Sequence, residues 1–233
     1  MRTLLMFLLW GIATPLSSLV AMPWTLLTGD VSLLYRMAMW IALTGVRLAG
    51  VRWRLHGIDN VLATKNCIYM SNHVSNLDPP LLIPLLPRRT SVLVKKELFR
   101  IPVLATAMRM GSLVPVDRKN REAAVASVKE GVKVLQQGLD MTVFPEGTRS
   151  KDGRLLPFKK GPFYMAMESG VPIVPVTILG SELLWPKGKN LVRPGVVDIV
   201  FHPPILPGEH PDRDDLMKVV RDAVASALPP ERR

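Results

Sequence analysis

The fold is decided by one stretch of the chain, Cys67-Ile68-Tyr69-Met70-Ser71-Asn72-His73-Val74-Ser75-Asn76-Leu77-Asp78-Pro79-Pro80. Its first five residues are apolar enough for a buried β-strand, and the two prolines at its end are typical of the first turn of a helix. A short polar loop lies between them. Loops that follow a strand are where α/β folds place reacting groups. The stretch therefore predicts a strand, a loop that carries a candidate site, and a helix.

The same alternation continues beyond Val51 and predicts an α/β fold, with a mixed central sheet flanked by helices. The other predicted strands are residues 91–94, 141–144, 172–178 and 196–201. Helices are predicted at residues 119–137, 158–168 and 213–227, each followed within three residues by a glycine or a proline. Pro172 and Pro175 restrict their strand to an edge of the sheet or to an irregular course.

The first fifty residues have a different character. No charged residue occurs from Thr3 to Thr28, a run longer than the roughly 20 residues that span a bilayer. Pro15 and Pro23 interrupt this run, so one straight helix is not expected. A second apolar stretch, residues 37–46, is short and better suited to a membrane interface. A cleaved secretory signal is the alternative interpretation of the first run.

We place the boundary near Gly50. Residues 1–50 are predicted to be a membrane-associated helical segment, and residues 51–233 the catalytic domain. The chain is 48% hydrophobic and yet carries a formal charge of +11. This pairing fits a protein on an anionic membrane surface, where each Lys or Arg gains about 1 kcal/mol. Nucleic-acid binding is disfavoured, because aromatic residues make up only 6% and no binding module is present.

The loop after the first strand offers an acid–base pair. His73 is a natural general base near neutral pH. Asp78 follows five positions later, and a tight turn would bring its carboxylate against the imidazole and fix the tautomer. Alternatively, Asp78 caps the helix that Pro79 opens, and both roles are compatible. The spacing alone is weak evidence.

Three further blocks carry candidate groups. Phe144-Pro145-Glu146-Gly147-Thr148-Arg149-Ser150 follows a predicted strand, and its glycine turn and arginine suit a phosphate. The alternative is a solvated loop with surface charges. Gly111-Ser112-Leu113-Val114-Pro115-Val116-Asp117-Arg118 is a short apolar segment that ends in a charged pair. The last block is Val171-Pro172-Ile173-Val174-Pro175-Val176.

Taken together and in this order, the four blocks resemble the glycerolipid acyltransferase family, specifically bacterial 1-acylglycerol-3-phosphate acyltransferases. The resemblance covers roughly residues 57–180. It implies transfer of a fatty acyl group from acyl-CoA or acyl-carrier protein to the sn-2 hydroxyl of lysophosphatidic acid, which gives phosphatidic acid, without a cofactor or metal. One departure is Val74, where the family often has glutamine, so no donor contact of that amide is carried over.

The resemblance also implies roles for individual residues. His73 would take the proton from the acceptor hydroxyl, with Asp78 orienting it. The block that contains Pro172 would shape the acyl-donor side. The acceptor site would be built by Arg118, Glu146, Gly147, Thr148 and Arg149, with the arginines facing the phosphate. Lys95 and Lys96 lie in a stretch similar to one that recurs in the family, and one of the two, Lys95 or Lys96, would also neutralise phosphate. A solvated charge pair is the alternative.

The implied reaction is direct: the deprotonated hydroxyl attacks the thioester carbonyl, the thiol leaves, and no acyl-enzyme forms. Cys67 as a nucleophile is disfavoured because it begins an apolar strand. A hydrolase that uses Ser71 or Ser75 with His73 is a second function class, although the chain has no Gly-x-Ser-x-Gly elbow. A nonenzymatic basic protein that binds membranes or nucleic acid is the third function class. Among acyltransferases, the alternative is a different lysolipid acceptor, such as a lyso-aminolipid. We expect docking on the cytoplasmic face of a cell membrane, among its phospholipids.

Overall fold

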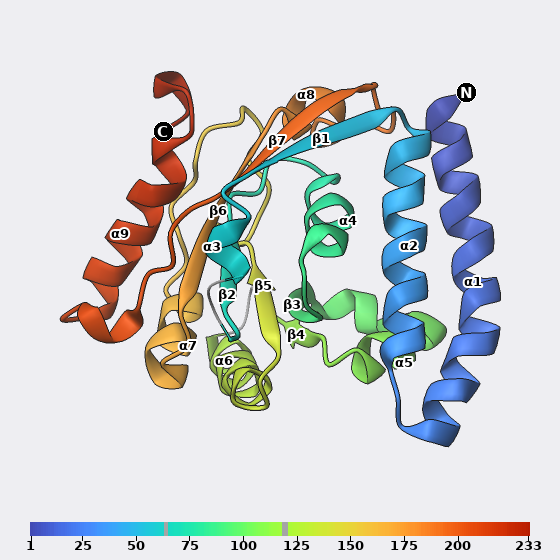
Figure 1. The fold of residues 1–233 in the computed structure, drawn as a ribbon, viewed down its shortest axis with the longest axis horizontal. Helices are drawn as coiled ribbons and strands as arrows, with labels where there is room; N and C mark the ends of the chain where they lie inside the picture. Colours follow the sequence, from blue (N-terminus) through green and yellow to red (C-terminus); the bar gives the residue numbers. More distant parts are fainter. Residues whose placement is uncertain (63–64, 118–120) are drawn as a thin grey trace.

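The structure is a computed structural model that describes residues 1–62, 65–117 and 121–233. A pair of long helices lies along one side of a twisted β-sheet, and further helices cover both faces of the sheet (Figure 1). The two long helices are α1 (Arg2–Thr28) and α2 (Ser32–Leu48), which run antiparallel and are joined by a tight turn at Gly29. We call this pair the hairpin.

Helix α1 continues through Pro15 and Pro23, so the two prolines do not divide the apolar run, and the expectation that the helix is not straight stays a prediction. Each proline removes one helical hydrogen bond. Both proline rings lie on the exposed face of α1, away from α2. The opposite face is packed: Trp10 Nε1 donates to Ile41 O of α2 at 3.1 Å, Thr3 Oγ1 donates to Val192 O at 3.0 Å, and Ala21 and Thr25 are buried farther along. Packing therefore outweighs the two missing bonds.

The sheet has seven strands in the order β1-β7-β6-β2-β5-β3-β4. The pair β6–β7 is antiparallel and every other neighbouring pair is parallel, so the predicted mixed sheet is confirmed. Strands β1 and β4 were not predicted. The bounds of the strands are β1 (Val51–His56), β2 (Ile68–Ser71), β3 (Thr90–Lys95), β4 (Val114–Val116), β5 (Asp140–Val143), β6 (Ile173–Leu179) and β7 (Gly195–Phe201).

Helices form a layer on each face of the sheet. The remaining helices are α3 (Asp59–Leu62), α4 (Asp78–Leu82), α5 (Pro102–Met110), α6 (Arg121–Gln136), α7 (Gly161–Ser169), α8 (Ser181–Leu184) and α9 (Arg213–Ser226). Short 3-10 turns are η1 (Ile83–Leu85), η2 (Lys96–Arg100), η3 (Pro207–Glu209) and η4 (Pro230–Arg232). The three predicted helices correspond to α6, α7 and α9. Figure 1 shows α9 and the hairpin at opposite ends of the molecule.

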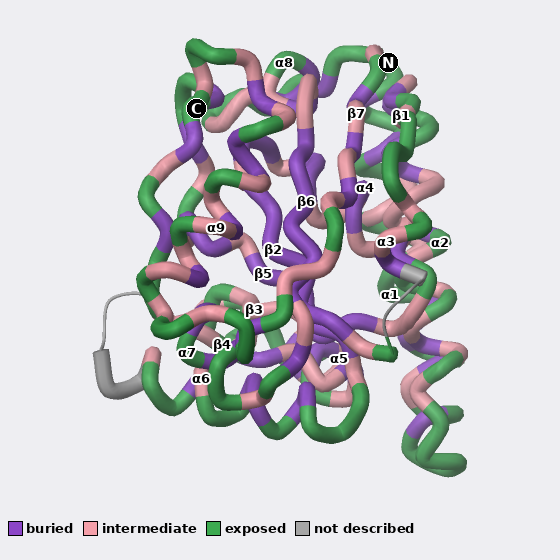
Figure 2. Tube along the Cα trace, turned by 60° about the vertical axis from the view of Figure 1, so that its left-hand side comes forward, coloured by how far each residue is buried: buried purple, intermediate pink, exposed green. Residues whose placement is uncertain are grey.

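Strand β2 divides the interior into two apolar clusters, because alternate side chains of a strand point to opposite faces. Tyr69 lies in one cluster together with Met6 and Val46 of the hairpin. Ile68 and Met70 lie in the other, beneath α7 and α9. Figure 2 shows β2, β5 and β6 as the buried centre of the molecule. The hairpin thus shares a core with the sheet, and the division of the chain near residue 50 stays a prediction.

Strand β6 lies inside the sheet, between β2 and β7, so its expected place at an edge is wrong. Its ladder with β7 begins only at Val176. Before that point Pro175 O accepts the His202 N–H, and a separate bridge joins the strand to Ile205. Pro175 has no N–H to donate, and it lies between the bridge at Ile173 and the start of the ladder at Val176, where no such donor is needed. The expected irregular course is therefore found on the β7 side only.

We predict that Gly45→Ala destabilises the protein. A Cβ at Gly45 would lie 2.1 Å from Nε1 of Trp10, so the indole must move and lose its bond to Ile41. We expect a loss of about 1–3 kcal/mol in the free energy of unfolding, as for other overpacked sites. The matched control is Gly11→Ala in α1, where no atom lies within 4 Å. There the usual helix preference for alanine should add up to about 1 kcal/mol.

Thermal unfolding of both variants in detergent micelles measures the difference. If Gly45→Ala were as stable as Gly11→Ala, the close packing of α1 on α2 would be wrong.

Candidate active site

Two of the predicted blocks and Lys95 follow or end strands that stop at the same edge of the sheet. Strands β2, β5 and β3 are parallel neighbours, so their carboxyl ends lie side by side. His73 follows β2, the block of residues 144–150 follows β5, and Lys95 ends β3. The next strand of the sheet, β4, leads towards Arg118, which lies outside the described residues. The sheet thus gathers segments that are far apart in the sequence.

His73 and Asp78 form the expected pair. The ring Nδ1 of His73 lies 2.8 Å from Oδ2 of Asp78. The Asp78 side chain is fully buried, and 13% of the His73 side chain remains exposed. An ionised carboxylate only accepts hydrogen bonds, so Nδ1 carries the proton and Nε2 presents its lone pair. His73 is therefore an oriented base, and part of its side chain is accessible from solvent.

The carboxylate of Asp78 organises the whole loop. Its Oδ2 also accepts the backbone N–H groups of Val74 and Ser75, both at 2.8 Å, and its Oδ1 accepts the hydroxyl of Ser181 at 2.6 Å. Asp78 is the first residue of α4, and no side chain caps that helix. The alternative helix-capping role is therefore wrong, since the carboxylate turns back to the preceding loop. Ser181 comes from α8, and only the tertiary structure reveals it.

Glu146 ties two of the blocks together. Its Oε1 accepts the backbone N–H of His73, and its Oε2 accepts the backbone N–H of Leu156 at 2.9 Å. The residue is 2% exposed. Burial raises the pKa of Glu146 from its ordinary 4.5 to about 7, although both N–H groups act in the opposite direction. Both carboxylate oxygens accept backbone N–H groups, and the place of Glu146 in the acceptor site stays a prediction.

Two further residues position the histidine. The Phe144 ring stacks on the His73 imidazole, with the ring centroids 4.2 Å apart and an angle of 27° between the planes. The buried Asn72 side chain donates to Ile178 O and accepts from Ile178 N, which locks the end of β2 to β6. Phe144 and Asn72 lie next to predicted site residues in the sequence, but no sequence pattern indicates that they position the histidine.

Arg149 reaches the loop of His73. Its guanidinium donates to Oδ1 of Asn76. Lys187, which sequence reasoning missed, donates to Arg149 O at 2.7 Å and to the exposed hydroxyl of Thr148 at 3.4 Å. Gly147 makes the turn with a φ of +69°, a conformation that other residues rarely adopt. Two cationic side chains thus lie at this turn, and Arg149 contacts the loop that carries His73.

Lys95 has no direct contact with the other predicted site residues in the described chain. Its ammonium group lies 3.6 Å from Glu97, and 60% of its side chain is exposed. Within the described chain, Lys95 makes no hydrogen bond to His73 or to the loop of residues 144–150. Lys95 thus lies on the correct edge of the sheet without joining the other predicted residues.

The potential nucleophiles are engaged elsewhere. Cys67 is fully buried at the amino end of β2, the opposite end from His73. The Ser71 hydroxyl donates to Asn72 O, and the Ser75 hydroxyl donates to Trp185 O at 2.8 Å. Neither serine donates to the imidazole. The hydrolase interpretation therefore lacks a serine that is activated by His73.

With the geometry established, the chain can be compared with known proteins. A sequence model of the family described as "Acyltransferase" matches residues 52–179, which hold the pair His73–Asp78 and the loop of residues 144–150. The chain belongs to the acyltransferase family. The region of the family match begins directly after the hairpin.

Relatives of this acyltransferase extend over most of its length. It is 34% identical over 230 residues to a 1-acyl-sn-glycerol-3-phosphate acyltransferase of Limnanthes douglasii, covering 95% of this chain and 79% of that protein. It is 30% identical to the enzyme of the same name from Borreliella burgdorferi, covering 78% of this chain and 73% of that protein.

The fold has a solved counterpart in the same family. The crystal structure of the 1-acyl-sn-glycerophosphate (LPA) acyltransferase PlsC from Thermotoga maritima matches with a TM-score of 0.84 and 26% identity. The match covers 97% of this chain and 94% of that chain, so it includes the hairpin as well as the sheet.

We predict a pH signature for Glu146. From about pH 4.5 upwards the unfolded chain ionises this carboxyl, whereas the folded chain holds its proton until about pH 7. Relative to Glu146→Gln, the wild-type protein should therefore lose up to about 3 kcal/mol of stability as the pH rises through this window. The stability that the protonated Glu146 carboxyl contributes is fully present below pH 4.5.

Urea denaturation of both proteins from pH 4.5 to 8 measures the difference. Glu130→Gln is the control, because Glu130 is an exposed residue of α6. The difference in the free energy of unfolding between Glu130→Gln and wild type should not change with pH. A flat difference for Glu146→Gln as well would show that the buried carboxyl titrates normally.

Proposed function

We propose that this acyltransferase moves a fatty acyl group from acyl-CoA or acyl-carrier protein to the sn-2 hydroxyl of 1-acylglycerol-3-phosphate, which gives phosphatidic acid. The observation that carries the proposal is the oriented base His73, held by Asp78 and lying beside the turn of Gly147 and Arg149. The relatives from Limnanthes douglasii and Borreliella burgdorferi are 1-acyl-sn-glycerol-3-phosphate acyltransferases, which supports this acceptor. The proposal places the enzyme in phospholipid biosynthesis.

The chemistry follows from the position of the base. Nε2 of His73 takes the proton of the acceptor hydroxyl while the hydroxyl oxygen attacks the thioester carbonyl. The carbon–sulfur bond breaks, the ester forms, and the proton on His73 neutralises the departing thiolate. Asp78 keeps the imidazole in one tautomer and stabilises its charged form. No acyl-enzyme is required, which agrees with the absence of an activated serine at the described site.

The acceptor phosphate is assigned to the turn after β5. Arg149 has a planar fork of donors that suits a phosphate, and Lys187 adds a second positive charge beside it. Arg118 and Lys95 stay predicted contributors. The alternative acceptor is another lysolipid, such as a lyso-aminolipid. A panel of lysolipids offered with one labelled acyl thioester separates the two, since transfer to lysophosphatidic acid should dominate.

We predict that His73→Ala lowers the transfer rate by about 10²- to 10⁴-fold, the usual contribution of a general base. Asp78→Asn should also abolish most activity, because the amide cannot hold the productive tautomer. Initial rates with a short-chain soluble acceptor measure both effects, and circular dichroism checks the fold.

The chain contains its own control for these substitutions. His210 and Asp215 have the same spacing, with Nδ1 and Oδ2 2.7 Å apart, but they lie at the start of α9. His210→Ala and Asp215→Asn should leave the rate within about twofold of wild type, as they lie away from the reacting groups. If His73→Ala retained more than about a tenth of the rate, His73 would not be the base.

We further propose that α1 lies in the plane of the membrane on its cytoplasmic face. In the described chain α1 is the helix long and apolar enough to cross a bilayer. However, helix α2 packs between α1 on one side and α4, η1 and β1 on the other. These contacts extend from Tyr35, whose hydroxyl accepts the Thr90 N–H, to Ala49, which is buried. A transverse α1 would draw these elements into hydrocarbon.

An in-plane helix instead presents its outer face to lipid. That face carries exposed large apolar side chains, among them Leu4, Leu8, Ile12, Leu16, Leu19 and Leu26. The acceptor is itself a membrane lipid, so this docking brings His73 to the substrate without extracting a long acyl chain. Extraction would cost about 0.8 kcal/mol for every exposed methylene.

We predict that Ile12→Gln/Leu19→Gln weakens vesicle binding at least tenfold. Each side chain that leaves the lipid costs about 1.5 kcal/mol or more. Flotation with phospholipid vesicles measures the binding. Activity towards a short-chain soluble acceptor should persist.

The control, Val125→Gln/Leu206→Gln, removes two exposed apolar side chains elsewhere on the surface. Equal weakening by both double variants would contradict docking through α1. Deleting residues 1–51 is a poorer test, because it also removes Val46 and Ala49 from the core.

A further inference from the structure

A basic cavity lies at the base of the hairpin, apart from the catalytic loop. It has a volume of about 710 Å³ and is lined by Arg2 at the start of α1, by Arg47 at the end of α2 and by Arg52 of β1. Gly50 and Pro194 complete the wall. None of the residues assigned to catalysis or to the acceptor lines it. Three arginines from three elements therefore converge on one hollow.

These arginines lack anionic partners. Within the described residues no ion pair or hydrogen bond to a carboxylate is found for Arg2, Arg47 or Arg52, whereas the neighbouring Arg54 is paired with Asp198 at 2.7 Å. Arg47 is held in place by Trp53, with its guanidinium carbon 5.1 Å from the ring centroid. Three uncompensated guanidinium groups around one cavity repel one another unless an anion lies between them.

The local backbone adds to the positive potential. Arg2 lies in the first turn of α1, where the helix dipole favours a negative charge, and neither an acidic residue nor a side-chain cap is present in that turn. Gly50, with a φ of +82°, leaves room for Arg2: a Cβ there would lie 2.7 Å from its Nη1. The absence of a side chain at Gly50 lets the guanidinium turn into the cavity.

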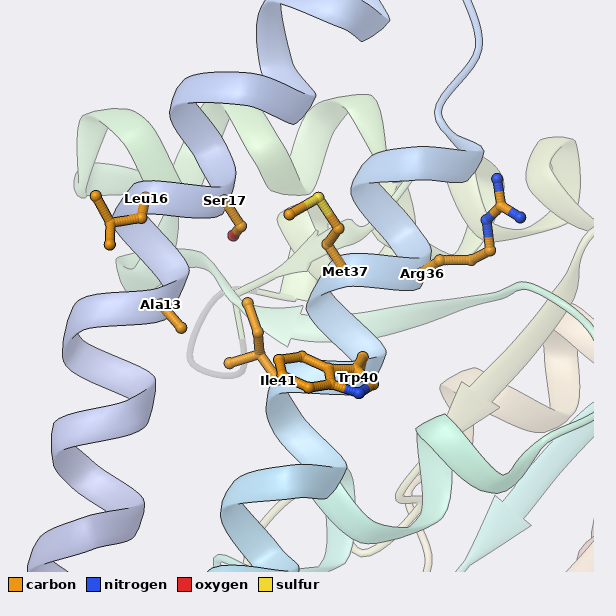
Figure 3. A pocket seen from close by; sticks show the side chains of 7 residues that line it. All are labelled: Ala13, Leu16, Ser17, Arg36, Met37, Trp40 and Ile41. Atoms are coloured by element: carbon orange, nitrogen blue, oxygen red, sulfur yellow. The ribbon is translucent and has the colours of Figure 1, made fainter.

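An apolar groove of about 430 Å³ lies farther along the hairpin. It is lined by Ala13, Leu16 and Ser17 of α1 and by Arg36, Met37, Trp40 and Ile41 of α2 (Figure 3). Arg36, Trp40 and Arg47 occupy one stripe of α2, because four and eleven residues are close to whole turns of a helix. The groove and the basic cavity thus share this stripe of α2, on which Arg36 and Arg47 lie about 16 Å apart along the helix axis. This separation suits an acyl chain.

We infer that the basic cavity binds the phosphate of an intact anionic membrane phospholipid, whose acyl chain follows the hairpin towards the apolar groove. Arginine forks bind phosphate through paired hydrogen bonds, and the apolar side chains beside them match the lipid tail. The inference rests on the proposed docking of the hairpin on a membrane. The bound lipid is a docking ligand and takes no part in acyl transfer.

The test is a titration of full-length protein in neutral detergent with dioctanoyl phosphatidylglycerol, followed by thermal unfolding. A ligand that binds only the folded state raises the unfolding midpoint in a saturable way. We expect Arg2→Gln/Arg52→Gln to weaken the apparent affinity at least tenfold. The control, Lys129→Gln/Lys218→Gln, removes two positive charges from α6 and α9, and should bind like wild type. Equal affinities of the two double variants would overturn the site.

Further arms of the titration identify the ligand. Dioctanoylglycerol, which lacks phosphate, should give no shift that depends on Arg2 and Arg52. If inorganic phosphate alone shifted wild type as strongly at the same concentration, the cavity would be a free-phosphate site and the lipid assignment would be wrong. Acyl transfer to a short-chain soluble acceptor should be unchanged in Arg2→Gln/Arg52→Gln, which shows that it is folded. Failure of the proposed reaction would appear separately, as absent transfer by wild type.

Discussion

The buried carboxylate of Asp78 is the contact on which the loop after β2 depends. It accepts four hydrogen bonds, from the His73 ring, from the backbone of Val74 and Ser75, and from the Ser181 hydroxyl. A carboxylate removed from water is stable only when its oxygens are satisfied in this way. The same contacts bend the chain between strand and helix, and they fix the imidazole. Folding and orientation of the base therefore have one cause.

A second carboxylate, Glu146, supports the same loop from the other side. By accepting the His73 backbone N–H, it joins the end of β2 to the turn that follows β5. Asp78 and Glu146 lie close enough for their charges to interact, which adds to the burial that raises the pKa of Glu146. The site thus keeps two acidic groups near one histidine, but only Asp78 touches the imidazole. Arg149 and Lys187 then place positive charge where an acceptor phosphate would lie.

In the proposed docking, the hairpin extends this organisation to the membrane. Its inner helix α2 belongs to the core of the protein, and its outer helix α1 exposes an apolar face. The base and its substrate can therefore meet at the surface of a bilayer without a flexible tether. An arginine cavity at one end of the hairpin would hold the protein against anionic lipid. Docking and catalysis are parts of one rigid arrangement in this view.

The sequence by itself determined the α/β class, five of the strands, three of the helices and the pair His73–Asp78. These features are local, because strand and helix periodicity and turn residues act within a few positions of the chain. The same spacing and the same contact recur at His210–Asp215, at the start of α9 rather than after a strand. The parallel arrangement of β2, β5 and β3 then gathers Glu146 and Arg149 around the first pair, which the sequence pattern does not show.

The tertiary structure also overruled local rules. Prolines did not end α1, because packing on α2 holds the helix together, and a proline entered an interior strand where the ladder is broken. Ser181 and Lys187 joined the site from segments that carry no recognisable pattern. Such contacts depend on which distant segments the sheet brings together, and a single sequence does not contain that information in any local form.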